Sequence, residues 1–277
     1  MELENKRRIY LVFAYTLLAI GAAIMILPFL WMILTALKTS GEVMQFPPTL
    51  FPNSPQWKNF VEAWNRAPFA KYFLNSLLVT TLSTIGELFT TILAAYAFAK
   101  MKFRGKNVIF VFLLATMMVP GEILTITNYV TLSKLKLIDT YGALIIPWLA
   151  SIFSTYVLKT TFEQIPDSLR QAARVDGCGD WRFLWTVMVP LGKSSIVTTA
   201  LLKIIGSWNS FLWPLLVTHR TELRTLPVGL QAFNTEAGTN FELLMAASTI
   251  VVLPILIIYS LLQNQIISGI ASSGSKG

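Results

Sequence analysis

The stretch Gln171-Ala172-Ala173-Arg174-Val175-Asp176-Gly177, followed by Val187-Met188-Val189-Pro190, is polar and helix-forming, and it lies between two long apolar segments. A chain that only had to turn around between apolar segments could do so in a few residues. This chain instead spends residues 162–190 on an amphipathic structure with a break at Gly177. The stretch therefore indicates a surface that is held by a partner in the water phase.

The composition around this stretch is that of a membrane protein. Of the 277 residues, 54% are hydrophobic and 13% are charged, and the mean hydropathy is +0.61. Globular domains carry about a quarter charged residues. The net charge of +8 could suggest nucleic acid, but the basic residues stand in short clusters beside apolar segments. That arrangement orients a membrane protein, so nucleic acid is excluded as a partner.

Long apolar runs set the predicted fold, because a helix needs about 20 apolar residues to cross a bilayer. We predict an all-α integral membrane protein with six transmembrane helices at 10–37, 72–99, 107–131, 140–161, 191–217 and 242–267. The first run is too long for a signal peptide and lacks a cleavage site, so we read it as a retained span. Pro120-Gly121 and Pro147 should kink the third and fourth spans.

The orientation follows from lysine and arginine in the segments between spans. One side holds Lys6, Arg7, Arg8, Lys100, Lys102, Arg104, Lys106, Lys159, Arg170, Arg174, Arg182, Lys193 and Lys276. The other side holds Lys38, Lys58, Arg66, Lys71, Lys134, Lys136, Arg220 and Arg224. The bias predicts that both termini and the loop between the fourth and fifth spans are cytoplasmic.

These spans give a simple domain plan. We expect a cytoplasmic N-terminus at 1–9, a permease domain at 10–267 with its cytoplasmic loop at about 162–190, and a tail at 268–277. The tail is small and polar, so it should be unstructured unless a partner binds it. The Pro-rich outer segment 38–71 should be extended, with a short helix near 56–64.

The loop itself has the signals of two helices. Pro166 and Asp167 suit a first turn, and Gly177 suits the left-handed residue that ends a helix. Asp180 can cap a second helix, which Pro190 should end or kink. The first helix presents a small, mostly apolar face made of Leu169, Ala172, Ala173 and Asp176, with Gln171 and Arg174 beside it. A partner protein could approach that face closely, although an amphipathic loop lying on lipid headgroups is an alternative.

The loop resembles the signature of ATP-binding-cassette (ABC) importer permeases, which reads Glu-Ala-Ala, three residues, Gly, nine residues, Ile-x-Leu-Pro. Ala172, Ala173, Gly177 and Pro190 match, whereas Gln171, Val187 and Val189 replace Glu, Ile and Leu. Because Gln171 has no charge, a salt bridge made by the family's Glu is not expected here. Asp176-Gly177, Gly206-Ser207-Trp208-Asn209, Phe211-Leu212-Trp213-Pro214, Thr225-Leu226-Pro227 and Lys276-Gly277 resemble the carbohydrate-uptake branch.

The resemblance implies a subunit of a larger machine in the bacterial cytoplasmic membrane. The implied partners are a second permease, two ATPase subunits that bind ATP and Mg, an extracytoplasmic sugar-binding protein and membrane lipid. The chain has no Gly-x-x-x-x-Gly-Lys-Ser/Thr loop, so we expect it to bind no cofactor and to hydrolyse no ATP itself. The ATPase-coupling surface would comprise Leu169, Gln171, Ala172, Ala173, Asp176, Gly177 and Pro190.

Three charges fall near the middle of predicted spans. Glu87, Glu122 and Lys203 should each face protein or water, because a charge at the bilayer centre is costly. Glu87 and Lys203 could form a structural pair between helices, or any of the three could line the pathway. Sugars are held by aromatic faces and hydroxyl or amide groups, which makes candidates of Asn128, Ser151, Ser154, Trp208 and Asn209. Trp208 and Asn209 could equally serve helix packing.

Two other functions stay open at this point. A proton-coupled secondary transporter could use Glu87, Glu122 and Lys203 as a relay, but it would not need the Gln171–Pro190 loop. A membrane enzyme is disfavoured, because one cysteine (Cys178) and one histidine (His219) offer neither a metal site nor a nucleophile–base pair. We expect no catalytic residue and no metal, and we read Cys178 as a small filler.

Overall fold

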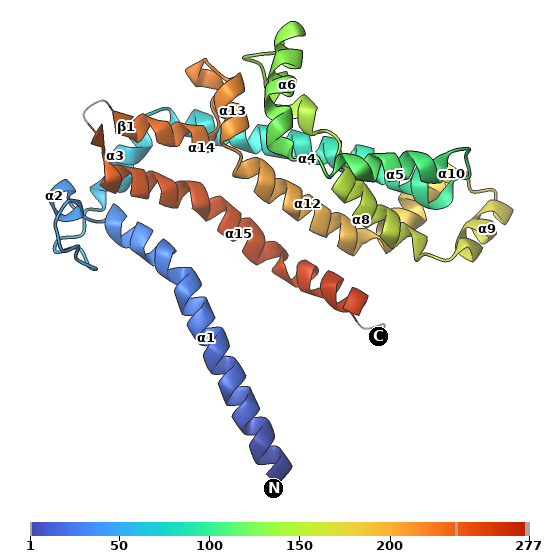
Figure 1. Cartoon of the computed structure of the whole chain (residues 1–277), viewed down its shortest axis with the longest axis horizontal. Helices are drawn as coiled ribbons and strands as arrows, with labels where there is room; N and C mark the ends of the chain where they lie inside the picture. The colour runs from blue at the N-terminus through green and yellow to red at the C-terminus, as the bar shows by residue number, and fades with distance from the viewer. Residues whose placement is uncertain (1, 236–237, 275–277) are drawn as a thin grey trace. The chain divides into compact units, whose positions relative to one another are not determined.

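The computed structural model describes residues 2–235 and 238–274, and most of them are helical (Figure 1). The helices are α1 (Glu2–Ala36), α2 (Ser40–Val43), α3 (Lys58–Asn65), α4 (Phe69–Lys100), α5 (Lys106–Thr116), α6 (Gly121–Lys134), α7 (Tyr141–Ile145), η1 (Ile146–Trp148), α8 (Ile152–Glu163), α9 (Asp167–Val175), α10 (Asp180–Phe183), η2 (Leu184–Met188), α11 (Val189–Leu191), α12 (Lys193–Trp208), α13 (Leu212–Val217), η3 (Thr221–Leu223), α14 (Leu226–Gly229), η4 (Leu230–Phe233) and α15 (Phe241–Gly274). The short strands β1 (Asn234–Thr235) and β2 (Gly238–Thr239) pair antiparallel. The chain forms two compact units, 1–69 with 230–253 and 70–229 with 254–277, and each is described by itself.

The predicted spans correspond to three unbroken helices and three bent pairs. Tyr10–Ala36, Phe69–Lys100 and Phe241–Leu261 are each long and apolar enough to cross a membrane. Among the described residues there are six such elements if each bent pair counts as one span. The prediction of six spans is compatible with this count.

The two predicted kinks are present. The axes of α5 and α6 differ by 97°, with Pro120 directly before α6. Those of the Tyr141–Trp148 and Ile152–Glu163 segments differ by 42°, and Pro147 lies just before the break. Both bends follow from proline, which lacks the N–H that a continuous helix needs and clashes with the preceding turn.

The prediction of one continuous fifth span at 191–217 is wrong. Helix α12 ends at Trp208, three non-helical residues follow, and α13 begins at Leu212. The bent pair in this region is instead Asp180–Leu191 with Lys193–Trp208, at 80°. The two breaks fall at short polar stretches, Asn209-Ser210 and Gly192 to Ser195, which are too short for an average of hydropathy over a whole span to reveal.

Pro190 lies close to the break that it predicts. The helical segment Asp180–Leu191 ends one residue after Pro190, and an 80° bend follows at Gly192, before α12. The preceding turn, η2, is π-helical. A wider turn is a known response where proline removes a backbone hydrogen bond from a helix.

In the first unit, the segment after α1 is tied by side-chain hydrogen bonds. The predicted short helix is α3, and its Asn59 Nδ2 donates to the carbonyls of Ala36 (2.8 Å) and Lys38 (2.9 Å). Helix α2 was not expected; it begins with a capping box between Thr39 and Glu42.

The predicted unstructured tail at 268–277 is wrong for residues 268–274. Helix α15 continues from Phe241 to Gly274. The backbone from 268 to 274 continues the preceding apolar helix, although this stretch has three serines and two glycines, which are weak helix formers. The last part of the predicted tail, 275–277, lies outside the described residues.

Two apolar cores lie among the described residues of the second unit. One joins α4, α8, α10 and η2 through Ile92, Ala95, Tyr96, Leu158, Phe162, Ile165, Phe183, Leu184 and Met188. The other joins α4, α6, α7 and α13 through Val79, Leu132, Ala143, Leu144, Trp213 and Val217. Helix α4 takes part in both, so it connects the two ends of the unit.

Candidate functional site

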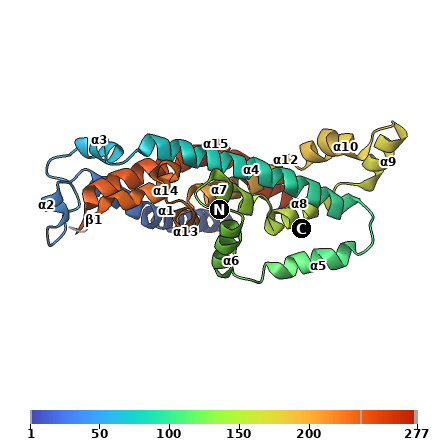
Figure 2. The ribbon, with the colours of Figure 1, turned by 90° about the horizontal axis from the view of Figure 1, so that it is seen from above.

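The loop between α8 and α12 has the helix–glycine–helix form that its sequence predicts. Helix α9 begins after Pro166, and Gly177 adopts φ +74°, the left-handed conformation that favours glycine. A Cβ added at Gly177 would meet nothing within 4 Å, so open space surrounds this turn. Helices α9 and α10 lie at the end of the second unit that also holds the last turn of α4 (Figure 2).

The predicted face of α9 is only partly available. Leu169 is 43% exposed, and Ala172 and Asp176 are also exposed. Ala173 is instead half-buried and packs against the core that contains Phe183 and Met188. The exposed apolar surface also includes Val175, which the sequence analysis did not single out and which is 88% exposed.

One anchor ties the start of α9 to the end of α4. Lys100 Nζ lies 2.7 Å from Asp167 Oδ1 and donates to the carbonyl of Ile165 at 2.6 Å. The hydrogen bond and the charge of Lys100 hold the pKa of Asp167 below its ordinary value. Lys100 is 9% exposed, so its ammonium group is committed to this contact.

A second anchor centres on Asp180. Its Oδ1 accepts from Arg170 Nη2 at 2.9 Å and from the hydroxyl of Tyr96 at 3.0 Å, and its Oδ2 accepts from Arg174 at 3.3 Å. The prediction that Asp180 caps the second helix is wrong, because the cap position is Gly179. The carboxylate is engaged by two arginines and a tyrosine, so it joins α9, α10 and α4.

The interior below these anchors is apolar. Phe183, Leu184 and Met188 are each no more than 2% exposed, and Cys178 packs at the edge of the same core. Cys178 therefore has the filler role that its size suggested. Helix α9 is thus linked by polar contacts to both α4 and α10.

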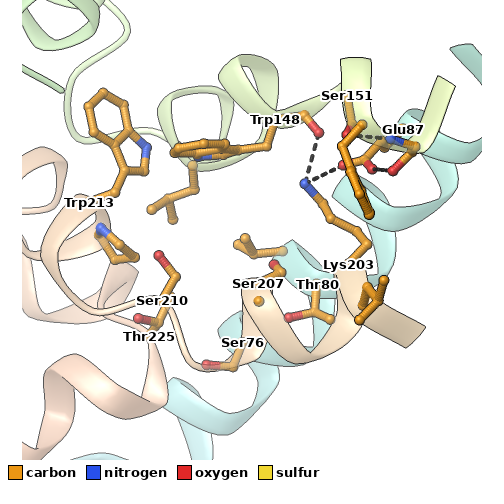
Figure 3. A pocket seen from close by; sticks show the side chains of 17 residues that line it. Ser76, Thr80, Glu87, Trp148, Ser151, Lys203, Ser207, Ser210, Trp213 and Thr225 are labelled. Atoms are coloured by element: carbon orange, nitrogen blue, oxygen red, sulfur yellow. Dashed lines mark hydrogen bonds and ion pairs between the residues drawn. The ribbon is translucent and has the colours of Figure 1, made fainter. Parts of the chain in front are cut away.

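The second feature is a pocket of about 360 Å³ between α4, α8, α12 and α13 (Figure 3). That volume is within the range of small-molecule sites, about 300–1,000 Å³. Its wall consists of Ser76, Val79, Thr80, Glu87, Leu144, Trp148, Ser151, Phe153, Ser154, Leu202, Lys203, Gly206, Ser207, Ser210, Trp213, Pro214 and Thr225. All of these residues belong to the second unit.

Two of the predicted intramembrane charges meet in this pocket. Lys203 Nζ lies 2.8 Å from Glu87 Oε2, while Glu87 Oε1 accepts a hydrogen bond from Ser154 Oγ at 2.8 Å. The side chains of Lys203 and Glu87 are 12% and 7% exposed. The two readings of these charges are therefore compatible, because the pair joins two helices and also lines a cavity.

The same region supplies hydrogen-bond donors to two backbone carbonyls at the break in the fourth span. The carbonyl of Trp148 accepts from Lys203 Nζ at 3.0 Å, and the carbonyl of Leu149 accepts from the hydroxyl of Thr90. Non-helical backbone at membrane depth needs such partners, because lipid offers none. Ser151 Oγ caps the start of α8 by accepting from the amide of Ser154.

The structure separates the predicted pathway residues into two groups. Ser151, Ser154, Glu87 and Lys203 line the pocket. Asn128, Trp208, Asn209 and Glu122 do not.

The second group lies elsewhere for distinct reasons. Trp208 is 2% exposed and meets the ring of Phe73 edge-on at 5.7 Å, which is helix packing. Asn209 is exposed at the end of α12, and Glu122 is exposed in the first turn of α6. Asn128 is half-buried on α6. Of three predicted intramembrane charges, Glu122 alone has no place in the pocket.

Sequence reasoning missed most of the pocket wall. Trp148, Trp213, Thr80, Ser207 and Thr225 come from five segments that only the fold brings together. These residues alternate with apolar residues in the sequence, so no local pattern marks them as part of a pocket. The described residues contain no group of three or more His, Cys, Asp or Glu side chains that could hold a metal ion.

Comparison of the sequence with known families finds one model that matches most of the chain. The family described as binding-protein-dependent transport system inner membrane component matches residues 87–272. This region contains α9, the Gly177 turn and both residues of the Glu87–Lys203 pair.

Curated relatives align over nearly their full length. The sn-glycerol-3-phosphate transport system permease protein UgpE of Yersinia pestis is 30% identical over 279 residues, covering 98% of this chain and 99% of its own. The arabinooligosaccharides transport system permease protein AraQ of Halalkalibacterium halodurans is 32% identical over 268 residues, covering 94% and 96%. The AraQ protein of Bacillus subtilis is 32% identical over 253 residues, covering 90% of each chain.

A solved structure has the same fold. A chain of a bacterial ABC transporter involved in the import of the acidic polysaccharide alginate superposes with a TM-score of 0.82, covering 93% of this chain and 96% of that one at 23% identity. A second alginate transporter structure, in complex with a periplasmic protein that holds an alginate pentasaccharide, gives a TM-score of 0.65 at 16% identity.

Proposed function

The chain belongs to the family of binding-protein-dependent transport system inner membrane components, and on that premise we propose that it is one of two permease subunits of an ATP-driven sugar importer. The proposed coupling to an ATPase subunit rests on a single observation, the surface of α9. It is an exposed helix with a small apolar face, and a left-handed glycine follows its last turn. Ion pairs hold its first residue, Asp167, to Lys100 and its last turn, through Arg174, to Asp180.

In this proposal α9 is the element that an ATPase subunit grips. Leu169, Gln171, Ala172, Asp176 and Gly177 would form the docking surface, because these residues are exposed. Ala173 would support this surface from the buried side of α9, because it packs the helix against the apolar core. Pro190 would act at a distance, through the π-helical turn that precedes it.

The two anchors connect this docking surface to the helices that line the pocket. A displacement of α9 would be transmitted to α4 through the ion pair between Lys100 and Asp167. It would reach α12 through α10, η2 and α11, which are continuous up to the bend at Gly192. Helices α4 and α12 carry Glu87 and Lys203, so movement of the loop would change the spacing of the two helices that line the pocket.

The sugar class rests on the relatives and on the pocket. AraQ is by its name a permease for arabinooligosaccharides, and UgpE one for glycerol 3-phosphate. The pocket offers indole faces and hydroxyl groups, which suit a polyhydroxylated ligand. We propose that the second permease supplies the other half of the pathway and that an extracytoplasmic binding protein delivers the sugar. In this scheme both termini and α9 face the cytoplasm.

Purification in mild detergent tests the assembly. A tagged chain expressed with its neighbouring genes should bring down a second permease and two ATPase subunits in stoichiometric amounts. A proton-coupled carrier would instead purify alone or as a homodimer, and its uptake would respond to a pH gradient without ATP. Recovery of that second kind of particle would contradict the proposal.

A further inference from the structure

The segment between α4 and α5 alternates basic and apolar side chains. It reads Lys100-Met101-Lys102-Phe103-Arg104-Gly105-Lys106, and the sequence has no Asp or Glu between Glu87 and Glu122. Helix α4 is long and apolar enough to cross a membrane, and α5 begins the next, bent span (Figure 2). A short connection between two spans lies at the surface of the bilayer, so this positive segment meets the lipid headgroups.

Two cations of this segment are uncommitted. Lys102 and Arg104 are exposed, and within the described part of the chain neither side chain forms a hydrogen bond or an ion pair. The carboxylate of Asp167 lies 2.7 Å from Lys100 Nζ. Lys100 lowers the pKa of Asp167 most, through its hydrogen bond and its charge, and Lys102 contributes least. An anion at this segment would therefore gain two cations that no carboxylate has already bound.

Exposed apolar side chains and a hollow accompany these cations. Phe103 is 41% exposed and Val108 is 61% exposed, and the ring of Phe103 lies 5.7 Å from that of Phe98 on α4. A hollow of about 420 Å³ is lined by residues of the segment 101–108, Lys102 among them. Cations beside apolar surface, at the depth of the headgroups, match the phosphate and the upper acyl chains of a phospholipid.

We propose that the segment 101–108 binds an anionic phospholipid, with Lys102 and Arg104 at the headgroup phosphate and with Phe103 and Val108 against the upper acyl chains. The inference goes beyond the proposed transport function, which assigns no role to this segment. A lipid is favoured over a protein in the water phase, because only residues 101–105 separate α4 from α5 and hold the segment close to the bilayer. An anionic headgroup is favoured over a zwitterionic one, which carries its own ammonium beside the phosphate.

The test measures lipid selectivity next to this segment in the assembled importer. Phe112 is 70% exposed on α5, one turn beyond Val108. A bimane fluorophore on Phe112→Cys, in a Cys178→Ala background with the other subunits free of cysteine, therefore reports on the adjacent lipids. The vesicles contain phosphatidylcholine and phosphatidylglycerol in one fixed ratio, and brominated acyl chains, which quench bimane, are carried by one lipid or by the other.

The quenching should show that phosphatidylglycerol binds at least about fivefold more tightly than phosphatidylcholine, which is the effect of roughly one cation near an anionic lipid. High salt should reduce that preference, because it screens exposed charges. In the double variant Lys102→Gln with Arg104→Gln, the two lipids should bind about equally.

Lys58→Gln with Arg66→Gln is the matched control. It removes one lysine and one arginine from exposed positions at the two ends of α3, so the loss of charge is the same. The control should keep the lipid preference of the parent. Both double variants should melt like the parent, since all four side chains are exposed.

Three results would overturn the inference: equal quenching by both brominated lipids in the parent, an unchanged preference in the Lys102 and Arg104 variant, or an equal loss of preference in the control. A Lys102 and Arg104 variant that loses its ATPase subunits and keeps the lipid preference would place these cations at a protein contact, which also overturns it. The importer assignment is read separately, from the ATPase subunits that co-purify with the parent. If those subunits are present and the lipid preference is absent, the lipid inference fails and the importer assignment stands.

Discussion

The ammonium nitrogen of Lys203 lies 2.8 Å from Oε2 of Glu87, which links α12 to α4 inside the second unit. Removing one partner of a buried ion pair leaves an uncompensated charge and costs about 3–5 kcal/mol. We therefore expect Lys203→Met and Glu87→Gln each to lower the melting temperature of the purified importer and to reduce uptake.

The charge-swapped double variant tests whether the pairing itself matters. Glu87→Lys with Lys203→Glu should be more stable than either Glu87→Lys or Lys203→Glu alone, because the swap restores opposite charges across the same gap. Thermal melts of the three variants in one detergent make the comparison. A double variant no better than the worse single one would count against the pair as a structural link.

The anchor between Asp167 and Lys100 should depend on pH in a defined direction. Lys100 holds the pKa of Asp167 below its ordinary value, so the ion pair stabilises the loop above that value, about 3.9. The contribution is lost as pH falls through the lower pKa of the folded state. A spin label at position 175, in a Cys178→Ala background, should therefore become more mobile below about pH 4.

Asp167→Asn is the control for that measurement. The amide has the size of the carboxyl group and lacks its charge, so the label should already be mobile at pH 7 and should show no acid step. Identical spectra for Asp167→Asn and the parent at pH 7 would show that the anchor does not restrain α9.

Two glycines in the second unit should respond oppositely to alanine. A Cβ at Gly192 would lie 2.7 Å from Cε1 of the fully buried Phe162, at the 80° bend before α12. A Cβ at Gly206 would meet nothing within 4 Å. We expect Gly192→Ala to destabilise by about 1–3 kcal/mol through overpacking. Gly206→Ala should be neutral or stabilising by up to about 1 kcal/mol, because alanine favours the helix. Chemical denaturation of both variants checks the difference, and equal midpoints would contradict it.

Local rules in the sequence were enough for the elements that depend on local geometry. Pro120 and Pro147 break their spans because proline cannot continue a helix. Gly177 ends α9 because the turn needs a positive φ. Both effects act within a few residues, so they can be predicted without knowing the fold.

The predictions that failed concern features that depend on tertiary structure. The break after Trp208 falls at the polar pair Asn209-Ser210, which is too short to lower the hydropathy of the whole span. Trp208 itself packs against Phe73 instead of lining a cavity. The lack of a partner for Thr80 is a property of its neighbours in space, so no sequence pattern marks it. For the same reason Asp180 looked like a helix cap, although two arginines from α9 engage it.

The central claim is that α9 and its glycine turn are held by an ATPase subunit, and substitution at Gly177 tests it most directly. Gly177 adopts φ +74° in open space, whereas Gly179 has φ −71° and equally open surroundings. Leucine at position 177 would strain the turn by about 1–2 kcal/mol and would add bulk where the partner must fit. Leucine at position 179 has an allowed backbone and serves as the control.

The measurement is the amount of ATPase subunit that co-purifies with each variant, together with sugar uptake by the same cells. We predict that Gly177→Leu loses both, that Gly177→Ala, with the strain and little bulk, is intermediate, and that Gly179→Leu retains both. A Gly177→Leu variant that keeps normal ATPase attachment and normal uptake would contradict the account.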